Sequence, residues 1–288
     1  MDSRAFRRFR KNRGALIGLV LSGIVCALAL FGPLAAPHPP DEQRREALLD
    51  ERGIPAAIAA VDGHPLGGDT VGRDELSRLL HGGAISMAVA LVATAIAVFL
   101  GLTIGVLSGY FGGLTDMASM RLVDLVLSVP FLLLAITVQR VFSSTDPDES
   151  LMVLFGLLGF LSWTTLARVV RAKALQVRRL EYVQAAIALG MGHGRVLLRH
   201  VLPNVIGPAI VIGTTLVAQM IIAESAMSYL GLGVQPPRAS WGSMLREGQD
   251  MLTVAPRLVL LPAGLIVMAV FGFNLLGEGL RDAFDPKE

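Results

Sequence analysis

Long apolar runs without charge alternate with charged segments along the chain. A helix that crosses a lipid bilayer needs about 20 consecutive, mostly apolar residues. Six segments have this character, at residues 14–36, 84–108, 125–139, 151–167, 205–223 and 258–277. The third is short and extends back through Arg121 and Asp124. The pattern predicts an all-α, polytopic integral membrane protein with six transmembrane helices.

Composition supports this class of protein. Of the 288 residues, 53% are hydrophobic and the mean hydropathy is +0.62, which suits a bilayer protein better than a soluble domain. The first span has a basic flank, as a signal peptide does, but its apolar run is longer than a signal core. We therefore expect an uncleaved helix. The lone Cys26 lies within this span and cannot form an internal disulfide.

The distribution of charge predicts the topology. Residues 1–13 hold six basic residues and one acid, and residues 168–199 hold seven basic residues and one acid. Residues 37–80 hold nine acids and five arginines. Because Lys and Arg are enriched in cytoplasmic loops, we expect the N-terminus and the 168–204 loop in the cytoplasm and residues 37–80 outside. Six spans return the C-terminus to the cytoplasm. These arginines explain the pI near 9.0, so we expect no nucleic-acid partner.

Glycine and proline mark special positions inside the spans. Gly101, Gly105 and Gly109 recur at four-residue spacing, which allows another helix to approach closely in lipid. Local flexibility near the helix end is the alternative interpretation. Pro130 predicts a kink in the third span, and Pro208 predicts a bend in the fifth.

Three charged residues lie within or near the membrane. Arg121 and Asp124 are three residues apart on one helical face, and we expect an ion pair near the interface or, alternatively, a gating role. Glu224 follows a long charge-free stretch, so it is a candidate for a residue of a transport path or a partner contact.

The sequence contains no motif for enzymatic chemistry. It has no Gly-x-x-x-x-Gly-Lys-Ser/Thr phosphate loop and no His-Glu-x-x-His metalloprotease motif. The histidines are scattered along the chain, whereas a metal site needs at least three convergent ligands. They are His38, His64, His81, His193 and His200. We therefore expect no catalytic, cofactor or metal site in this chain.

The basic 168–204 loop has a helical pattern. Tyr182, Ala185, Ala186 and Leu189 share one helical face, and Gly190 is suited to end that helix. The loop can dock on another protein, lie on anionic lipid, or pack on its own domain.

A second helix is indicated within the same loop. Leu197, His200 and Val201 have helical spacing, and Pro203 is expected to stop this helix. Together the two helices predict a helix–turn–helix outside the bilayer.

The same loop carries a family resemblance. Gln184-Ala185-Ala186, Gly190 and Leu202-Pro203 resemble the cytoplasmic "EAA" loop of binding-protein-dependent ABC importer permeases. The family motif begins with Glu, so Gln184 removes one possible salt bridge to an ATPase. The resemblance implies that the ATPase-docking residues are Glu181, Tyr182, Gln184, Ala185, Ala186, Leu189, Gly190 and Pro203.

The resemblance covers nearly the whole chain and is greatest to C-type permeases of oligopeptide, dipeptide and nickel importers. The outward-facing motif of that branch corresponds here to residues 64–78, which makes His64, Asp69, Arg73 and Asp74 candidates for contact with a binding protein. Further matches lie at Gly109–Gly113, Asp116, Arg121, Asp124, Trp163, Arg168, Arg171, Arg199–Asn204, Glu224, Tyr229–Gly233, Ser240–Gly242, Asn274–Gly277 and Asp285-Pro286. The segment at residues 50–62 is longer and richer in alanine than expected for this branch.

The resemblance implies a type I ABC importer permease in the bacterial inner membrane. Its expected partners are a second, related permease, two cytoplasmic ATPase subunits that bind ATP and Mg²⁺, and an extracytoplasmic solute-binding protein. The expected substrates are di- and oligopeptides; nickel or another metal complex, glutathione and other solutes are alternatives. We expect an N-terminal region, 1–80, and a five-helix permease core, 81–288. A stand-alone secondary transporter would usually show inverted repeats or membrane-buried carboxylates, whereas this sequence shows no repeat and few buried charges.

Overall fold

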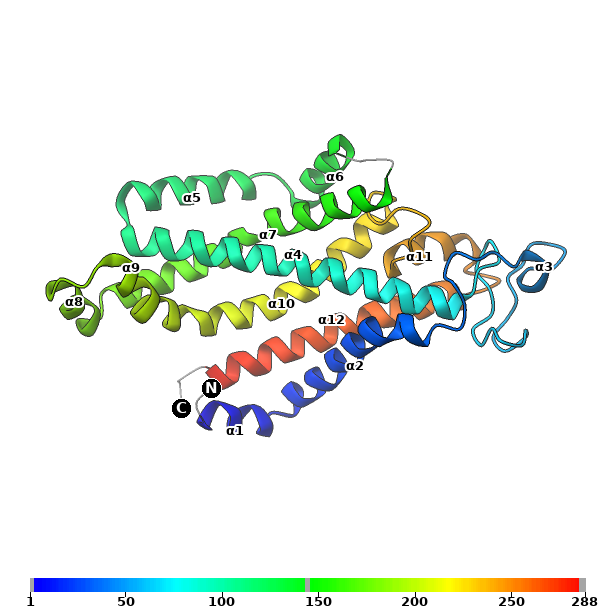
Figure 1. The fold of residues 1–288 in the computed structure, drawn as a ribbon, viewed down its shortest axis with the longest axis horizontal. Coiled ribbons are helices and arrows are strands. Elements are labelled where there is room, and N and C mark those ends of the chain that lie inside the picture. The colour runs from blue at the N-terminus through cyan, green and yellow to red at the C-terminus, as the bar shows by residue number, and fades with distance from the viewer. Residues whose placement is uncertain (1–2, 143–145, 285–288) are drawn as a thin grey trace.

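The computed structural model describes residues 3–142 and 146–284. Within these residues the regular elements are all helical, which confirms the predicted fold class. Long helices run along a common axis (Figure 1). These are α2 (Arg13–Ala35), α4 (Glu75–Phe111), α7 (Pro147–Arg178), α10 (Leu202–Tyr229) and α12 (Arg257–Phe284). The shorter elements are α1 (Ser3–Lys11), α3 (Arg45–Leu48), α5 (Gly113–Leu127), α6 (Phe131–Phe142), α8 (Glu181–Ala188), α9 (His193–Val196), η1 (Leu197–Val201), α11 (Trp241–Gly248) and η2 (Gln249–Met251).

The third predicted span is broken. In the described part of the chain, five helices are long and apolar enough to cross a membrane, and α5 with α6 makes a sixth candidate only as a pair bent by 85°. The break falls just before Pro130, which lacks a backbone N–H and disfavours the helical conformation in the preceding residue. Figure 1 shows α5 running beside α4 and α6 turned away from it. The kink predicted at Pro130 is confirmed, and at 85° it divides the span into two helices.

Direct contact between α4 and α7 confirms the predicted glycine packing. Gly101 faces Leu166, and Gly105 faces the Ala167 carbonyl. At Gly109 an added Cβ would lie 2.5 Å from the Arg171 carbonyl oxygen, a distance that real Cβ atoms do not tolerate. The spacing of four residues therefore removes side chains from one face of α4 over three turns, so that the two backbones touch.

The first and last spans form a second close pair. Gly18 of α2 meets the backbone of Leu275 and Leu276, and Gly279 of α12 meets Ala15. Figure 1 shows α2 running beside α12. The predicted boundary between residues 80 and 81 falls inside α4, so the N-terminal region and the core share a helix.

The loop predicted at 168–204 is mostly helix. Arg168 belongs to α7, and helical structure runs without interruption from His193 through α10. The expectation that Pro203 stops a helix was wrong. A π-turn precedes it, in which the Leu202 N–H bonds to the Leu197 carbonyl, and the Asn204 side chain donates to the His200 carbonyl at 2.7 Å. This altered register accommodates a proline at the start of α10.

The α4–α7 contact gives a direct prediction. We expect Gly109→Ala to destabilise the chain by about 1–3 kcal/mol, because a methyl group has no room against the α7 backbone. Gly156→Ala in α7 is the matched control, since a Cβ there meets nothing within 4 Å. Thermal unfolding in detergent measures both. Equal melting temperatures for the two variants would contradict the packing described.

Candidate functional site

The short helix α8 ends in a C-terminal capping turn at Gly190. The Gly190 N–H bonds to the Ile187 carbonyl at 2.9 Å, and the Met191 N–H bonds to the Ala186 carbonyl at 3.1 Å. This pair of bonds is the Schellman arrangement, which requires a left-handed residue after the helix. Gly190 has φ of +83°, and its predicted role as the helix end is confirmed.

One face of α8 is fixed to the ends of the long helices. Val183 and Ala186 are buried in a cluster with Val106 of α4, Val177 of α7 and Val201 of η1. Ala186 lies at the edge of the predicted face of Tyr182, Ala185 and Leu189 and is buried beside Val183, which the spacing of that face did not predict.

The opposite face of α8 is open. Leu189 is 88% exposed and Tyr182 is 47% exposed. The side chains of Glu181, Gln184 and Ala185 are also exposed. Leu189 therefore lies at the exposed end of a helix whose other face is held in the core.

Two of the exposed residues also contribute to the local structure. The Gln184 amide donates to the Arg178 carbonyl at 2.7 Å and so caps the end of α7. A glutamate carboxylate could not donate this bond. The Tyr182 hydroxyl accepts from Asn204 at 3.2 Å and connects α8 to α10, next to the exposed Pro203.

The charges on α5 pair with α7 and not with each other. Asp124 accepts from Arg168 at 2.6 Å, which replaces the predicted pair with Arg121. One turn of α7 further, Arg171 forms a two-pronged ion pair with Asp116. The prediction failed because α5 lies along α7, which brings Arg168 to Asp124 across the helix contact.

Glu224 is enclosed within the chain. It has no exposed surface, and its carboxylate accepts from Ser228 at 2.7 Å and from Ser86 at 2.9 Å. The Ser86 hydroxyl in turn accepts from the Trp241 backbone N–H. The carboxylate therefore joins α4, α10 and α11, and it does not line an exposed path.

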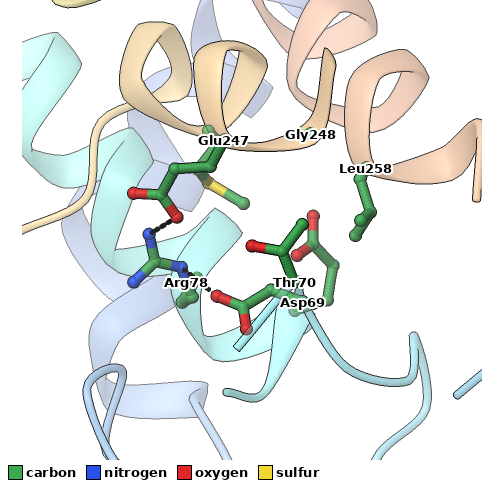
Figure 2. A pocket seen from close by; sticks show the side chains of 8 residues that line it. Asp69, Thr70, Arg78, Glu247, Gly248 and Leu258 are labelled. Atoms are coloured by element: carbon green, nitrogen blue, oxygen red, sulfur yellow. Dashed lines mark hydrogen bonds and ion pairs between the residues drawn. The ribbon is translucent and has the colours of Figure 1, made fainter. Parts of the chain in front are cut away.

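The outward motif forms a buried ionic network. Arg78 lies between two carboxylates, with 3.3 Å from its Nε to Asp69 and 2.8 Å from its Nη2 to Glu247 (Figure 2). Arg73 binds the same two acids, at 2.6 Å and 2.5 Å. The small pocket beside Arg78 is also lined by Thr70, Gly248 and Leu258.

The candidates for binding-protein contact are therefore not at the surface. His64, Asp69, Arg73 and Asp74 are each at most 9% exposed. Their side chains hold the outer segment onto α4 and α11, so they position a surface instead of forming one. The structure also brings His38 and His64 together with Asp74, which the scattered positions of the histidines did not predict. Asp285-Pro286 lies outside the described residues.

Two family models match the chain. Residues 101–288 match the family described as binding-protein-dependent transport system inner membrane component. Residues 3–50 match the N-terminal transmembrane domain of oligopeptide transport permease C.

Similar proteins extend over nearly the whole chain. The oligopeptide transport system permease protein OppC of Escherichia coli (strain K12) is 37% identical over 284 residues, which covers 99% of this chain and 90% of that protein. OppC of Bacillus subtilis (strain 168) is 36% identical, covering 98% and 88%. The dipeptide transport system permease protein DppC of Haemophilus influenzae is 35% identical, covering 97% and 92%.

Proposed function

The chain belongs to the family of binding-protein-dependent transport system inner membrane components, and from this premise we propose that it is one of two permease subunits of an ATP-driven importer. The observation that carries the proposal is α8, which has one face fixed in the core and the other exposed. Such a helix is suited to enter a groove on another protein and to pass its movement to the helices beneath it.

We infer that the groove belongs to a cytoplasmic ATPase subunit. The chain has no phosphate loop, so ATP and Mg²⁺ would be bound by two such partners and no nucleotide by the permease itself. The exposed residues offered to the partner are Glu181, Tyr182, Gln184, Ala185 and Leu189. Ala186 supports them from the inner face.

The mechanism follows from how α8 is seated. Val183 and Ala186 share a core with residues of α4, α7 and α10, so α8 cannot move without these helices. Closure of the ATPases would shift this unit as a rigid body and bias the permease pair between inward-open and outward-open states. The second permease would complete the path between the two subunits, and a loaded solute-binding protein would bias the same equilibrium from outside.

Peptides are the substrates that the comparisons favour. The relatives described above carry the names of oligopeptide and dipeptide transport proteins, and they cover almost the whole chain. We therefore propose di- or oligopeptides as the transported solute. The binding protein would make the main selection, since the candidate charges in this chain are engaged in internal ion pairs.

We propose that α8 and both termini face the cytoplasm. Figure 1 supports a common side, because α8 and α1 lie toward one end of the bundle and α3 lies at the other. The basic N-terminal residues and the arginines around α8 are then on the side where Lys and Arg are enriched.

The coupling role is tested by a matched pair of glycine substitutions. Gly190→Val forces a β-branched residue into φ of +83°, which costs about 1–3 kcal/mol. We expect peptide uptake and substrate-stimulated ATPase activity to fall about tenfold or more in the assembled complex. Gly192→Val is the control, because Gly192 has φ of −61° and its Cβ would likewise meet nothing within 4 Å.

The result is read only where both variants assemble with their partners to wild-type levels. Full uptake and full stimulation in an assembled Gly190→Val complex would remove α8 from the coupling mechanism. An equal loss of uptake in both variants would show that transport is sensitive to any added side chain in this turn. It would contradict a specific role for the left-handed turn at Gly190.

The orientation is tested with reporter fusions. A reporter joined after Asp148, at the start of α7, should behave as extracytoplasmic, and one joined after Gly192 should behave as cytoplasmic. Alkaline phosphatase and green fluorescent protein fusions distinguish the two sides. Cytoplasmic behaviour after Asp148 would overturn the proposed topology.

A further inference from the structure

A polar cavity of about 360 Å³ lies beyond the end of α10, between the loop at 230–240 and α11. Its lining includes Gln235 of the loop and Arg246, Glu247 and Asp250 of α11 and η2. Figure 1 shows α11 toward the end of the bundle where α3 lies, which is the outer end in the proposed orientation. A solute that arrives from outside therefore meets this end of the chain first.

Two opposite charges in the cavity have no partner in the protein. The Arg246 guanidinium and the Asp250 carboxylate form no ion pair or hydrogen bond within residues 3–142 and 146–284. Both residues are exposed, so a ligand can reach them from the surface. The neighbouring buried network differs, because Arg73 and Arg78 each bind two acids there. The cavity therefore offers one cation and one anion to a ligand.

The loop fixes the position of the positive charge. Gly231 has φ of +79°, and a Cβ added there would lie 2.2 Å from Nη1 of Arg246. Only glycine leaves room for the guanidinium over this turn. The Gln235 amide donates to the Gly231 and Gly233 carbonyls at 3.2 Å and 3.0 Å and holds the turn in place.

Two glutamines in the lining add hydrogen-bonding groups of both kinds. Oε1 of Gln249 accepts from the Tyr229 hydroxyl at 2.6 Å, which leaves the Gln249 NH₂ group as a donor. Gln235 donates through Nε2, which leaves its Oε1 as an acceptor. The main chain of a peptide carries the complementary carbonyl and N–H groups.

The spacing of the two charges suits a short peptide. Arg246 and Asp250 are four residues apart in consecutive helical turns, a rise of about 6 Å. Two residues of extended peptide span at most about 7 Å. At neutral pH a free dipeptide has an ammonium group at one end and a carboxylate at the other, whatever its side chains. A permease that serves many peptides can recognise only the groups that all of them share.

We propose that this cavity binds short zwitterionic peptides as they enter the transport path, with the peptide carboxylate on Arg246 and the ammonium group on Asp250. The inference rests on the proposed function and names dipeptides as the class of substrate that fits best. Glu247 lines both this cavity and the small pocket in Figure 2, where its Oε2 accepts from Arg73 and Arg78. A bound peptide would therefore lie beside the ionic network that holds the outer segment.

The test measures binding of free dialanine to the purified transporter in nanodiscs, without the binding protein. Saturation-transfer difference NMR detects weak ligands of such a large particle. We expect saturable binding by the wild type and at least about fivefold weaker binding by Arg246→Gln and by Asp250→Asn, because each removes one charged hydrogen bond. Arg238→Gln is the control, since Arg238 lies in the same outer loop, pairs with Asp148 and does not line the cavity.

Blocked dipeptides identify which charge each residue recognises. Dialanine amide lacks the carboxylate, so it should bind equally to the wild type and to Arg246→Gln. N-acetyl-dialanine lacks the ammonium group, so it should bind equally to the wild type and to Asp250→Asn. If each variant instead weakened all three ligands by the same factor, the residues would act on the shape of the cavity alone, which would contradict the assigned contacts.

Unchanged dialanine binding in Arg246→Gln and Asp250→Asn would overturn the proposal, as would a wild-type transporter without saturable binding. Variants that bind dialanine normally but bind the loaded binding protein more weakly would also overturn it, because the cavity would then be a docking surface for that protein. Peptide uptake by the complete wild-type transporter tests the proposed function separately. Normal uptake combined with any of these results would remove only the role of the cavity.

Discussion

The structure depends on the direct contact between the backbones of α4 and α7. Gly101, Gly105 and Gly109 remove side chains from α4 over three turns, and the α7 carbonyls at Ala167 and Arg171 occupy the space. In lipid, where apolar burial gives little drive for helix association, this contact area is the main source of attraction. It also makes α4 and α7 a single stiff element. The outer ionic network sits at one end of this element, around Arg78, and α8 sits at the other.

The helix α8 is short, but its packing against the long helices holds it in place. An isolated helix of this length would not be stable in water. Val183 and Ala186 anchor α8 in a core that α4, α7 and α10 share, and Gly190 ends it at a fixed point. The exposed Leu189 is thereby presented at the tip. A push on α8 from a partner would be transmitted to the spans because packed cores shift as units.

The sequence predicted those features that local chemistry decides. The spacing of Gly101, Gly105 and Gly109, the break before Pro130 and the left-handed Gly190 each follow from the residue type alone. Prediction from the sequence failed where the outcome depends on which segments, far apart in the chain, pack against each other. Asp124 pairs with Arg168 of α7 and not with Arg121 of its own helix. Which side of α8 is buried depends on the helices packed against it, and a π-turn accommodates Pro203 within a continuous helix. Likewise, the convergence of His38 and His64 is tertiary, because the chain between them folds back on itself.

The central claim is that α7 and α8 move together as one rigid body. It is tested most directly by the distance between spin labels at Met152→Cys on α7 and Ala188→Cys at the end of α8, in a Cys26→Ser background. Both positions are exposed, and neither is among the residues proposed to contact the ATPase. Electron–electron double resonance on the assembled transporter should give the same distance distribution with and without ATP. A distribution that shifts when ATP is added would mean that α8 moves relative to α7, and would contradict the account.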